Sequence, residues 1–173
     1  MELERVEPVF QGAIFSVERQ TWTGAEHAYD VVRHLGASAV LPLTPEGDVL
    51  LVEQFRPAIG QRLAEIPAGL LDRREEDALA CATRELFEET GFRHTGIEFL
   101  GGVYTTAGFS DEYVHLFWAL TEPEPAAEPE RGISLLRRPF GEMVRAARGG
   151  RVRDAKTALA LLLAEARGVA EVR

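Results

Sequence analysis

Residues 75–92 constrain the fold most strongly, because their apolar side chains recur with the period of an α-helix. The residues that share this apolar face are Leu79, Ala82, Leu86 and Phe87. Side chains with this spacing can all face one core. Gly91 follows at a position where helices often end. The pattern predicts one amphipathic helix over residues 75–92.

The same segment concentrates negative charge. Glu85, Glu88 and Glu89 stand at positions i, i+3 and i+4, so their carboxylates share a face of the predicted helix. Like charges repel each other there, and a bound divalent cation relieves the repulsion. Carboxylate oxygens suit the hard cations Mg²⁺ and Mn²⁺. The alternative is a solvated acidic face, which is common on surface helices.

The second half of the segment resembles the signature of the Nudix hydrolase family. Residues 84–92 read Arg-Glu-Leu-Phe-Glu-Glu-Thr-Gly-Phe and fill the pattern R-E-U-x-E-E-x-G-U, in which U is a bulky apolar residue. Glu76 stands eight places before Arg84, as the signature requires, but Gly69 lies one residue too far from Glu76. We interpret this difference as a one-residue insertion within residues 70–75. The resemblance implies an α/β/α sandwich with the active site beside the signature helix.

Composition limits the class of protein. The chain has 173 residues, of which 46% are hydrophobic and 27% charged, and we expect a single domain over residues 1–173. Its net charge of −9 argues against nucleic acid or an anionic membrane as a general partner, because both need a basic surface. We found neither a membrane-span-length apolar run nor a signal-peptide pattern. The single Cys81 excludes an intrachain disulfide, and we expect a cytoplasmic protein.

Strand patterns fill much of the remaining chain. Residues 9–34 predict an N-terminal β-hairpin with a turn at Thr23-Gly24. Further strands are predicted at 37–43, 49–55, 63–66, 97–104, 113–120 and 133–136. Two late helices are predicted, one from Pro139 to Gly149 and one from a cap at Asp154 to Arg167. Strands with only a few interspersed helices predict an α/β protein whose helices cover a mixed sheet.

Outside the signature, the chain resembles the ADP-ribose pyrophosphatase branch of the Nudix family. Residues 54–57 (Gln-Phe-Arg-Pro), followed by residues 65–69 (Glu-Ile-Pro-Ala-Gly), are similar to an arrangement in that branch. Residues 106–112 are similar to its loop Ser-Pro-Gly-Phe-Thr-Asp-Glu, although Ala107 replaces the proline that helps to mark ADP-ribose enzymes. The resemblance implies hydrolysis of ADP-ribose to AMP and ribose 5-phosphate, and a homodimer formed through the N-terminal hairpin.

Roles can be assigned to individual residues. The candidate metal ligands are three carboxylates and, by resemblance, one main-chain carbonyl: Glu85, Glu88, Glu89 and Ala68. Arg84 would orient Glu88 or another signature carboxylate through charge-assisted hydrogen bonds. Glu76 would fasten the signature loop to the helix. Arg56 is a candidate contact for the diphosphate, because a guanidinium group matches phosphate geometry, or it is simply an exposed arginine beside a turn.

The general base is an open assignment. In the resembled branch it often comes from a mobile loop before the last strand of the sheet, and Glu128 and Glu130 occupy that region here. We favour Glu130. Glu112 is an alternative in another loop of the candidate site, and Glu88 on the signature helix is the next candidate.

Substrate contacts and substrate identity are also open. Phe109, Tyr29 and Arg33 are candidate contacts for adenine or its ribose, and Glu112 belongs to the same candidate loop as Phe109. The alternative substrates are FAD, GDP-mannose, coenzyme A and a damaged nucleoside triphosphate. A non-catalytic nucleotide sensor is a remote alternative, because a sensor does not need every metal ligand of the signature.

Overall fold

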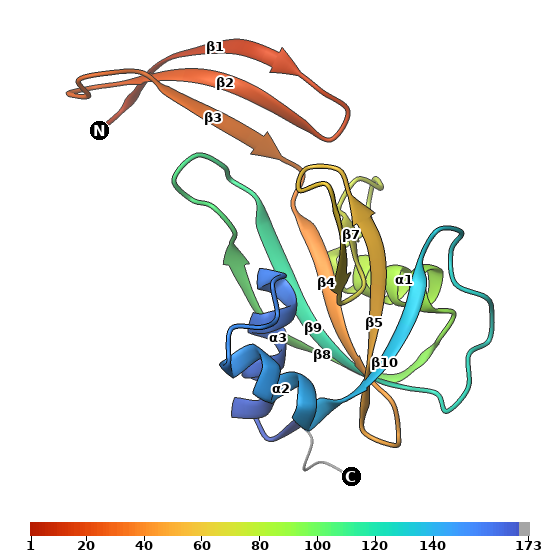
Figure 1. Ribbon diagram of the computed structural model, residues 1–173. Helices are drawn as coiled ribbons and strands as arrows, with labels where there is room; N and C mark the ends of the chain where they lie inside the picture. The colour runs from red at the N-terminus through yellow and green to blue at the C-terminus, as the bar shows by residue number, and fades with distance from the viewer. Residues whose placement is uncertain (170–173) are drawn as a thin grey trace.

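A computed structural model of the chain describes residues 1–169, which form two sheets and three helices (Figure 1). The larger sheet has seven strands: β4 (Ala37–Leu43), β5 (Asp48–Arg56), β6 (Gln61–Glu65), β7 (Ala68–Leu70), β8 (His94–Tyr104), β9 (Tyr113–Thr121) and β10 (Ser134–Pro139). The helices are α1 (Ala78–Thr90), α2 (Phe140–Arg148) and α3 (Ala155–Ala166). The strand order is β10-β5-β4-β9-β8, with β6 beside β5 and β7 beside β4. Because β4 and β9 run parallel and the other pairs antiparallel, the sheet is mixed, as predicted.

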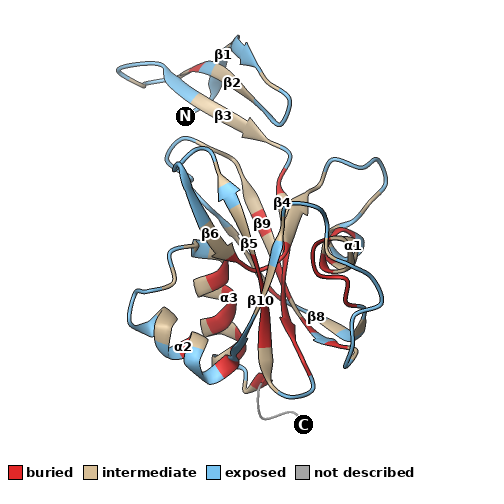
Figure 2. Cartoon of the chain, turned by 45° about the vertical axis from the view of Figure 1, so that its right-hand side comes forward, coloured by how far each residue is buried: buried red, intermediate tan, exposed pale blue. Residues whose placement is uncertain are grey.

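Helix α1 covers one face of this sheet, and α2 and α3 cover the other (Figure 1). Strand β4 shows how the sequence supports both layers, because successive side chains of a strand point to opposite faces. Ala39 and Leu41 belong to the core cluster that includes α2 and α3, whereas Val40 packs with Ala82 and Leu86 of α1. The buried residues therefore concentrate along the central strands (Figure 2). The predicted α/β/α sandwich is confirmed.

Helix α1 begins three residues later than predicted. Asp77 caps it, and its side chain accepts a 2.8 Å hydrogen bond from the amide of Ala80. Gly91 ends the helix in the left-handed conformation, as expected. The prediction that Leu79 faces the core is wrong, since its side chain is 45% exposed. The buried face of α1 is formed instead by Cys81, Ala82, Leu86, Glu89 and Thr90.

The N-terminal segment is a separate three-stranded antiparallel sheet. Its strands are β1 (Leu3–Gln11), β2 (Phe15–Trp22) and β3 (Tyr29–His34), in that order. The predicted hairpin is confirmed as β2 and β3, but its predicted start at residue 9 is wrong, because β1 adds a third strand. Pro8 argues against a strand at this point in the sequence, because proline lacks the amide hydrogen of a strand residue. It is tolerated here because β1 is an edge strand. This sheet projects from the larger sheet (Figures 1 and 2), and main-chain hydrogen bonds join Val32 of β3 to Phe109 and Asp111 in the loop between β8 and β9.

The other predicted strands and helices are found within a few residues of their predicted bounds. Residues 68–70, for which no strand was predicted, form the short strand β7 against β4. Helix α2 follows Pro139 and ends before Gly149, and Asp154 caps α3 through the amide of Thr157. No helix within residues 1–169 is both long enough and apolar enough to cross a membrane.

Candidate active site

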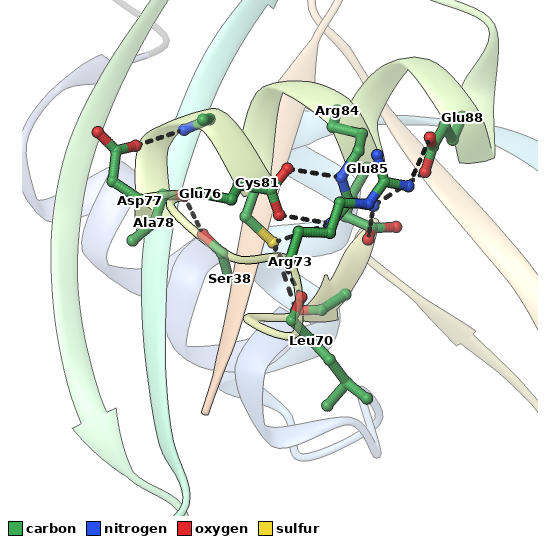
Figure 3. A network of polar contacts seen from close by, with 12 residues as sticks. Ser38, Leu70, Arg73, Glu76, Asp77, Ala78, Cys81, Arg84, Glu85 and Glu88 are labelled. Carbon is green, nitrogen blue, oxygen red and sulfur yellow. Dashed lines mark hydrogen bonds and ion pairs between the residues drawn. The ribbon is translucent and has the colours of Figure 1, made fainter. Parts of the chain in front are cut away.

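Arg84 organises the polar face of α1. Its guanidinium donates to the two carboxylate oxygens of Glu76 at 2.7 and 2.8 Å and to Glu88 at 2.9 Å, and it also donates to Glu85 (Figure 3). Arg73 donates a further bond of 3.1 Å to Glu88. Hydrogen bonds between a planar guanidinium and several carboxylates fix the carboxylate orientations. Arg84 thus ties Glu76, which lies just before the helix, to two of the three clustered glutamates.

Strand β7 meets the other carboxylate of the cluster. Glu89 is only 6% exposed, and its Oε2 accepts a 3.1 Å hydrogen bond from the amide of Ala68. Glu85 lies against the next residue of this strand, because a β-carbon on Gly69 would overlap the Glu85 carboxylate. Two glutamates of α1 therefore meet the main chain at Ala68 and Gly69, and the carbonyl of Ala68 is the main-chain oxygen predicted as a metal ligand.

The electrostatics of these carboxylates fit a divalent cation. Burial raises the pKa of Glu89 to about 7; the Ala68 amide opposes this rise, and the charge of Glu85 adds to it. Burial also raises the pKa of Glu85, although Arg84 opposes the shift. Such raised pKa values mean that the negative charge is incompletely compensated. A hard cation with oxygen ligands would supply that compensation.

The carboxylates do not converge on one point as the ligands of a metal ion would. Within residues 1–169, no three acidic, histidine or cysteine side chains are grouped closely enough to hold a metal ion. Arg84 holds Glu85 and Glu88, while Glu89 contacts β7. The residues present match a metal site in their chemistry, and a cation bound there would compete with Arg84 for Glu85 and Glu88.

A cavity of about 300 Å³ opens beside β7. Its lining comes from several distant segments: Ile14, His34, Ala37, Arg56, Ala68, Gly69, Leu70, Glu112, Val114 and Lys156. The structure thus brings together three residues predicted for the site, namely Arg56, Ala68 and Glu112. A cavity of this volume is at the lower end of the range for small-molecule sites.

The cationic wall of this cavity is built on Glu65. Arg56 donates two hydrogen bonds of 2.7 Å to the Glu65 carboxylate, which is 2% exposed. Lys156 also donates to Glu65, and it donates a 2.9 Å bond to Asp154. Burial would raise the pKa of Glu65, but Arg56 and Lys156 outweigh burial and lower it. Sequence reasoning missed Glu65 and Lys156 as site residues, although Lys156 is the only lysine in the chain.

Glu112 lies beside His34 in the lining of the cavity. Its Oε1 lies 3.7 Å from Nε2 of His34, and its other oxygen accepts a bond of 2.5 Å from the hydroxyl of Thr105. The amide of Gly36 donates to Nδ1 of the same histidine at 3.1 Å. Glu112 is therefore held at the cavity by two neighbouring segments.

The other predicted substrate contacts lie elsewhere. Arg33 pairs with Glu18 and Asp111, both at 2.9 Å, and lines a separate cavity of about 160 Å³. Phe109 and Tyr29 line a third cavity of about 720 Å³, between the N-terminal sheet and the loop that connects β8 and β9. The structure therefore distributes the predicted substrate contacts over three cavities.

Glu130 lies close to the carboxylate cluster. Its amide donates a 2.9 Å hydrogen bond to the main-chain oxygen of Glu88. Burial is the largest influence on the pKa of Glu89, and the Ala68 hydrogen bond and the charges of Glu85 and Arg56 follow. The charge of Glu130 comes next, and it raises that pKa. Its side chain is exposed, as is that of Glu128.

Comparison with known proteins decides the family. A sequence model of the NUDIX domain matches residues 32–160, which include α1, the carboxylate cluster and all of the cavity lining except Ile14. The chain belongs to the NUDIX domain family. This Nudix chain is 33% identical over 164 residues to the methanol dehydrogenase activator of Bacillus methanolicus, covering 91% of this chain and 88% of that protein. It is 32% identical over 162 residues to the ADP-ribose pyrophosphatase of Bacillus subtilis, covering 90% and 87%.

Two further comparisons support the assignment. The GDP-mannose pyrophosphatase of Cronobacter sakazakii is 32% identical over 175 residues, with 93% of this chain and 90% of that protein covered. The crystal structure of an ADP compounds hydrolase superposes with a TM-score of 0.81 at 21% identity, over 99% of this chain and 96% of the other. The latter likeness shows a shared fold.

The predicted family and enzyme class are confirmed by these findings. This Nudix protein is a hydrolase of phosphorus-containing acid anhydrides, and its substrate class is nucleoside diphosphate derivatives. Nudix hydrolases generally need a divalent metal, which agrees with the incompletely compensated carboxylates on α1.

Proposed function

We propose that this chain hydrolyses ADP-ribose to AMP and ribose 5-phosphate. The observation that carries the proposal is the meeting of half-buried Glu85 and buried Glu89 with β7, beside a cavity whose wall includes Arg56. This arrangement combines a site for a cation with a guanidinium that can bind a diphosphate. The 32% identity to the ADP-ribose pyrophosphatase of Bacillus subtilis supports the choice of substrate.

The proposed metal is Mg²⁺ or Mn²⁺. Its proposed ligands are the three clustered carboxylates and one main-chain oxygen: Glu85, Glu88, Glu89 and the carbonyl of Ala68. A cation bound there would supply charge for the phosphoryl oxygens and would lower the pKa of the attacking water. Arg84 positions the Glu85 and Glu88 carboxylates, and Glu76 anchors Arg84.

Arg56 is the proposed contact for the substrate diphosphate. Its Nε and Nη2 atoms face Glu65, which leaves Nη1 to donate toward a phosphate. The fixed plane of the guanidinium makes this orientation specific. Glu65 therefore aligns Arg56 before the substrate binds.

Glu130 is the proposed general base. A carboxylate that holds a divalent cation is a poor proton acceptor, so a base outside the metal ligands is favoured. Glu130 is the carboxylate of the β9–β10 loop whose charge acts on Glu89. Glu112, Glu128 and Glu88 are the alternatives that mutagenesis would separate.

The nucleoside is proposed to occupy the space near Phe109 and Tyr29. These aromatic side chains line the cavity of about 720 Å³, which is large enough for a base and its ribose. Glu112 follows Asp111 in the same loop but lines the cavity of about 300 Å³, from which it would accept a hydrogen bond from a ribose hydroxyl of the substrate. Arg33 would act on this region by holding Asp111, which belongs to the same loop as Phe109.

A second candidate substrate is GDP-mannose. Ala107 stands where the ADP-ribose branch has a proline, and the Cronobacter sakazakii relative is a GDP-mannose pyrophosphatase of 32% identity. The test is a panel of ADP-ribose, GDP-mannose, FAD and coenzyme A, with Mg²⁺ or Mn²⁺ and chromatographic identification of products. We expect ADP-ribose to give the highest kcat/KM. A higher value for another compound would replace ADP-ribose.

The N-terminal sheet is proposed to form a homodimer interface, within a single domain that spans residues 1–173. Large apolar side chains are exposed on this sheet: Leu3, Val6, Val9, Phe10, Ile14, Phe15 and Tyr29. A second copy would remove this surface from water. Light scattering at micromolar concentration is expected to give twice the mass of one chain. An active monomer would contradict the proposal.

We also propose a cytoplasmic location and neither nucleic acid nor a membrane as partner. The net charge of −9 supports this view, because polyanions repel an acidic surface. Fractionation of the native host followed by immunodetection would test the location.

A further inference from the structure

The loop between β9 and β10 is attached to the end of α1 by main-chain hydrogen bonds. The amides of Ala126 and Ala127 donate to the carbonyl oxygen of Gly91, at 2.8 and 3.3 Å. The amide of Glu130 donates to the carbonyl oxygen of Glu88, at 2.9 Å. Carbonyl groups at the end of a helix lack partners inside the helix, and here the loop provides them.

Gly91 allows this attachment because it has no side chain. A β-carbon built on Gly91 would lie 1.9 Å from the carbonyl oxygen of Ala127 and 2.9 Å from its carbonyl carbon. Both atoms belong to the main chain, so no side-chain rotation can relieve the overlap. The backbone of Gly91 also has a φ of 77°, a conformation that glycine adopts readily. Gly91 therefore serves both the helix end and the contact with the loop.

We propose that Gly91 is a positioning residue for hydrolysis, acting through Glu130. By admitting Ala127 against the helix end, Gly91 fixes the loop so that Glu130 lies beside the carboxylate cluster. This inference rests on the proposed function, in which Glu130 accepts the proton of the attacking water.

The loop is suited to transmit a displacement. Three prolines, Pro123, Pro125 and Pro129, each fix one backbone angle, so the segment has few ways to absorb a shift. Relieving the overlap would move Ala127 by about 1 Å or more, and misplacement of this size can cost on the order of 10²-fold in rate. Glu130 is three residues away from Ala127, so it would move with the loop.

The first test compares two glycine substitutions. Gly91→Ala introduces both the overlap and an unfavourable φ, whereas Gly150→Ala introduces only the unfavourable φ. Gly150 has a φ of 66°, and a β-carbon there would meet nothing within 4 Å. We expect kcat to fall on the order of 10²-fold in Gly91→Ala, with KM and metal dependence nearly unchanged. Gly150→Ala should keep the kcat of the wild type.

A further variant keeps the test informative if Gly91→Ala does not fold. Asparagine tolerates the left-handed conformation but still carries a β-carbon. Gly91→Asn is therefore expected to fold and to show the same loss of kcat. Wild-type kcat in Gly91→Asn would overturn the proposal.

The second test asks whether Gly91 acts through Glu130. The double variant Gly91→Ala/Glu130→Gln should lose no more kcat than Glu130→Gln alone, because the base would already be absent. A multiplicative loss would overturn the proposal, since Gly91 would then act by another route.

The third test measures the loop directly. Hydrogen exchange of the Ala126, Ala127 and Glu130 amides should become faster in Gly91→Ala but not in Gly150→Ala. Unchanged exchange at these amides would overturn the inference. This measurement needs no turnover, so it remains decisive if the wild-type protein fails to hydrolyse ADP-ribose, a result that would contradict the proposed function instead.

Discussion

Arg56 and Glu65 form an ion pair with two parallel hydrogen bonds, each 2.7 Å long, between the adjacent strands β5 and β6. The carboxylate is almost completely buried, whereas the arginine side chain is 40% exposed toward the cavity. The pair therefore joins the interior of the sheet to the proposed diphosphate site, and it gives the first two predictions.

Glu65→Gln should destabilise the protein. The change leaves Arg56 and Lys156 without their shared negative partner, and breaking a buried ion pair is costly. We expect the free energy of unfolding to fall by about 2–3 kcal/mol in urea denaturation. The matched control is Glu53→Gln, because Glu53 pairs with Arg62 on the surface. There we expect a loss of about 0.5 kcal/mol. Equal losses in the two variants would contradict the prediction.

The stabilisation by Glu65 should depend on pH. Because Arg56 and Lys156 lower the pKa of Glu65 below 4.5 despite its burial, the folded state binds its proton less readily than the unfolded state. The stabilisation is therefore complete well above pH 4.5 and is lost as the pH falls through the lower folded-state pKa. Urea denaturation at about pH 7 and about pH 3.5 should show the gap between wild type and Glu65→Gln shrinking in acid. If the difference in unfolding free energy between wild type and Glu65→Gln grew in acid, the lowered pKa of Glu65 would be contradicted.

Cys81 should be unreactive in the folded protein. Burial raises the pKa of its thiol to about 12, and its sulfur lies 3.5 Å from the main-chain oxygen of Leu70. The thiolate is the reactive form, so a chromogenic disulfide reagent at about pH 8 should label Cys81 only after urea is added. Rapid labelling of the native protein would show that α1 opens locally.

Metal ligand and general base should respond differently to loss of charge. Chelation is expected to abolish turnover, and Mg²⁺ or Mn²⁺ should restore it. Glu85→Gln removes a charge from the proposed metal site, so added metal should recover part of its lost activity. Glu130→Gln should keep metal affinity and lose kcat on the order of 10²–10⁴-fold. Steady-state rates over a metal titration distinguish the two cases. Activity undiminished in excess chelator would reject the metal site.

Several features follow from local sequence alone. The 3.6-residue period predicts α1, and it places Glu85, Glu88 and Glu89 on neighbouring turns of one helix. Two helix ends were also predictable, because capping depends on residues next to each other in the chain. Gly91 ends α1 in the left-handed conformation, and Asp154 accepts a hydrogen bond from the amide of Thr157 at the start of α3. The alternation of side chains between the two faces of a strand, as in β4, is another local property. The resemblance to the Nudix family rests on the same local signature.

Other features were decided only by tertiary structure. Lys156 meets Glu65 from 91 positions away, and nothing in the spacing of either residue encodes that contact. The sequence grouped Arg33 and Phe109 with Arg56, yet packing of the N-terminal sheet places them on three different cavities. Strand β1 escaped prediction because it has little buried surface to give it a pattern. The periodicity of a sequence shows only which side of a helix or strand is buried. Contacts between distant segments depend on the register of the sheet and on the packing of the helices against it, which decide which buried sides meet.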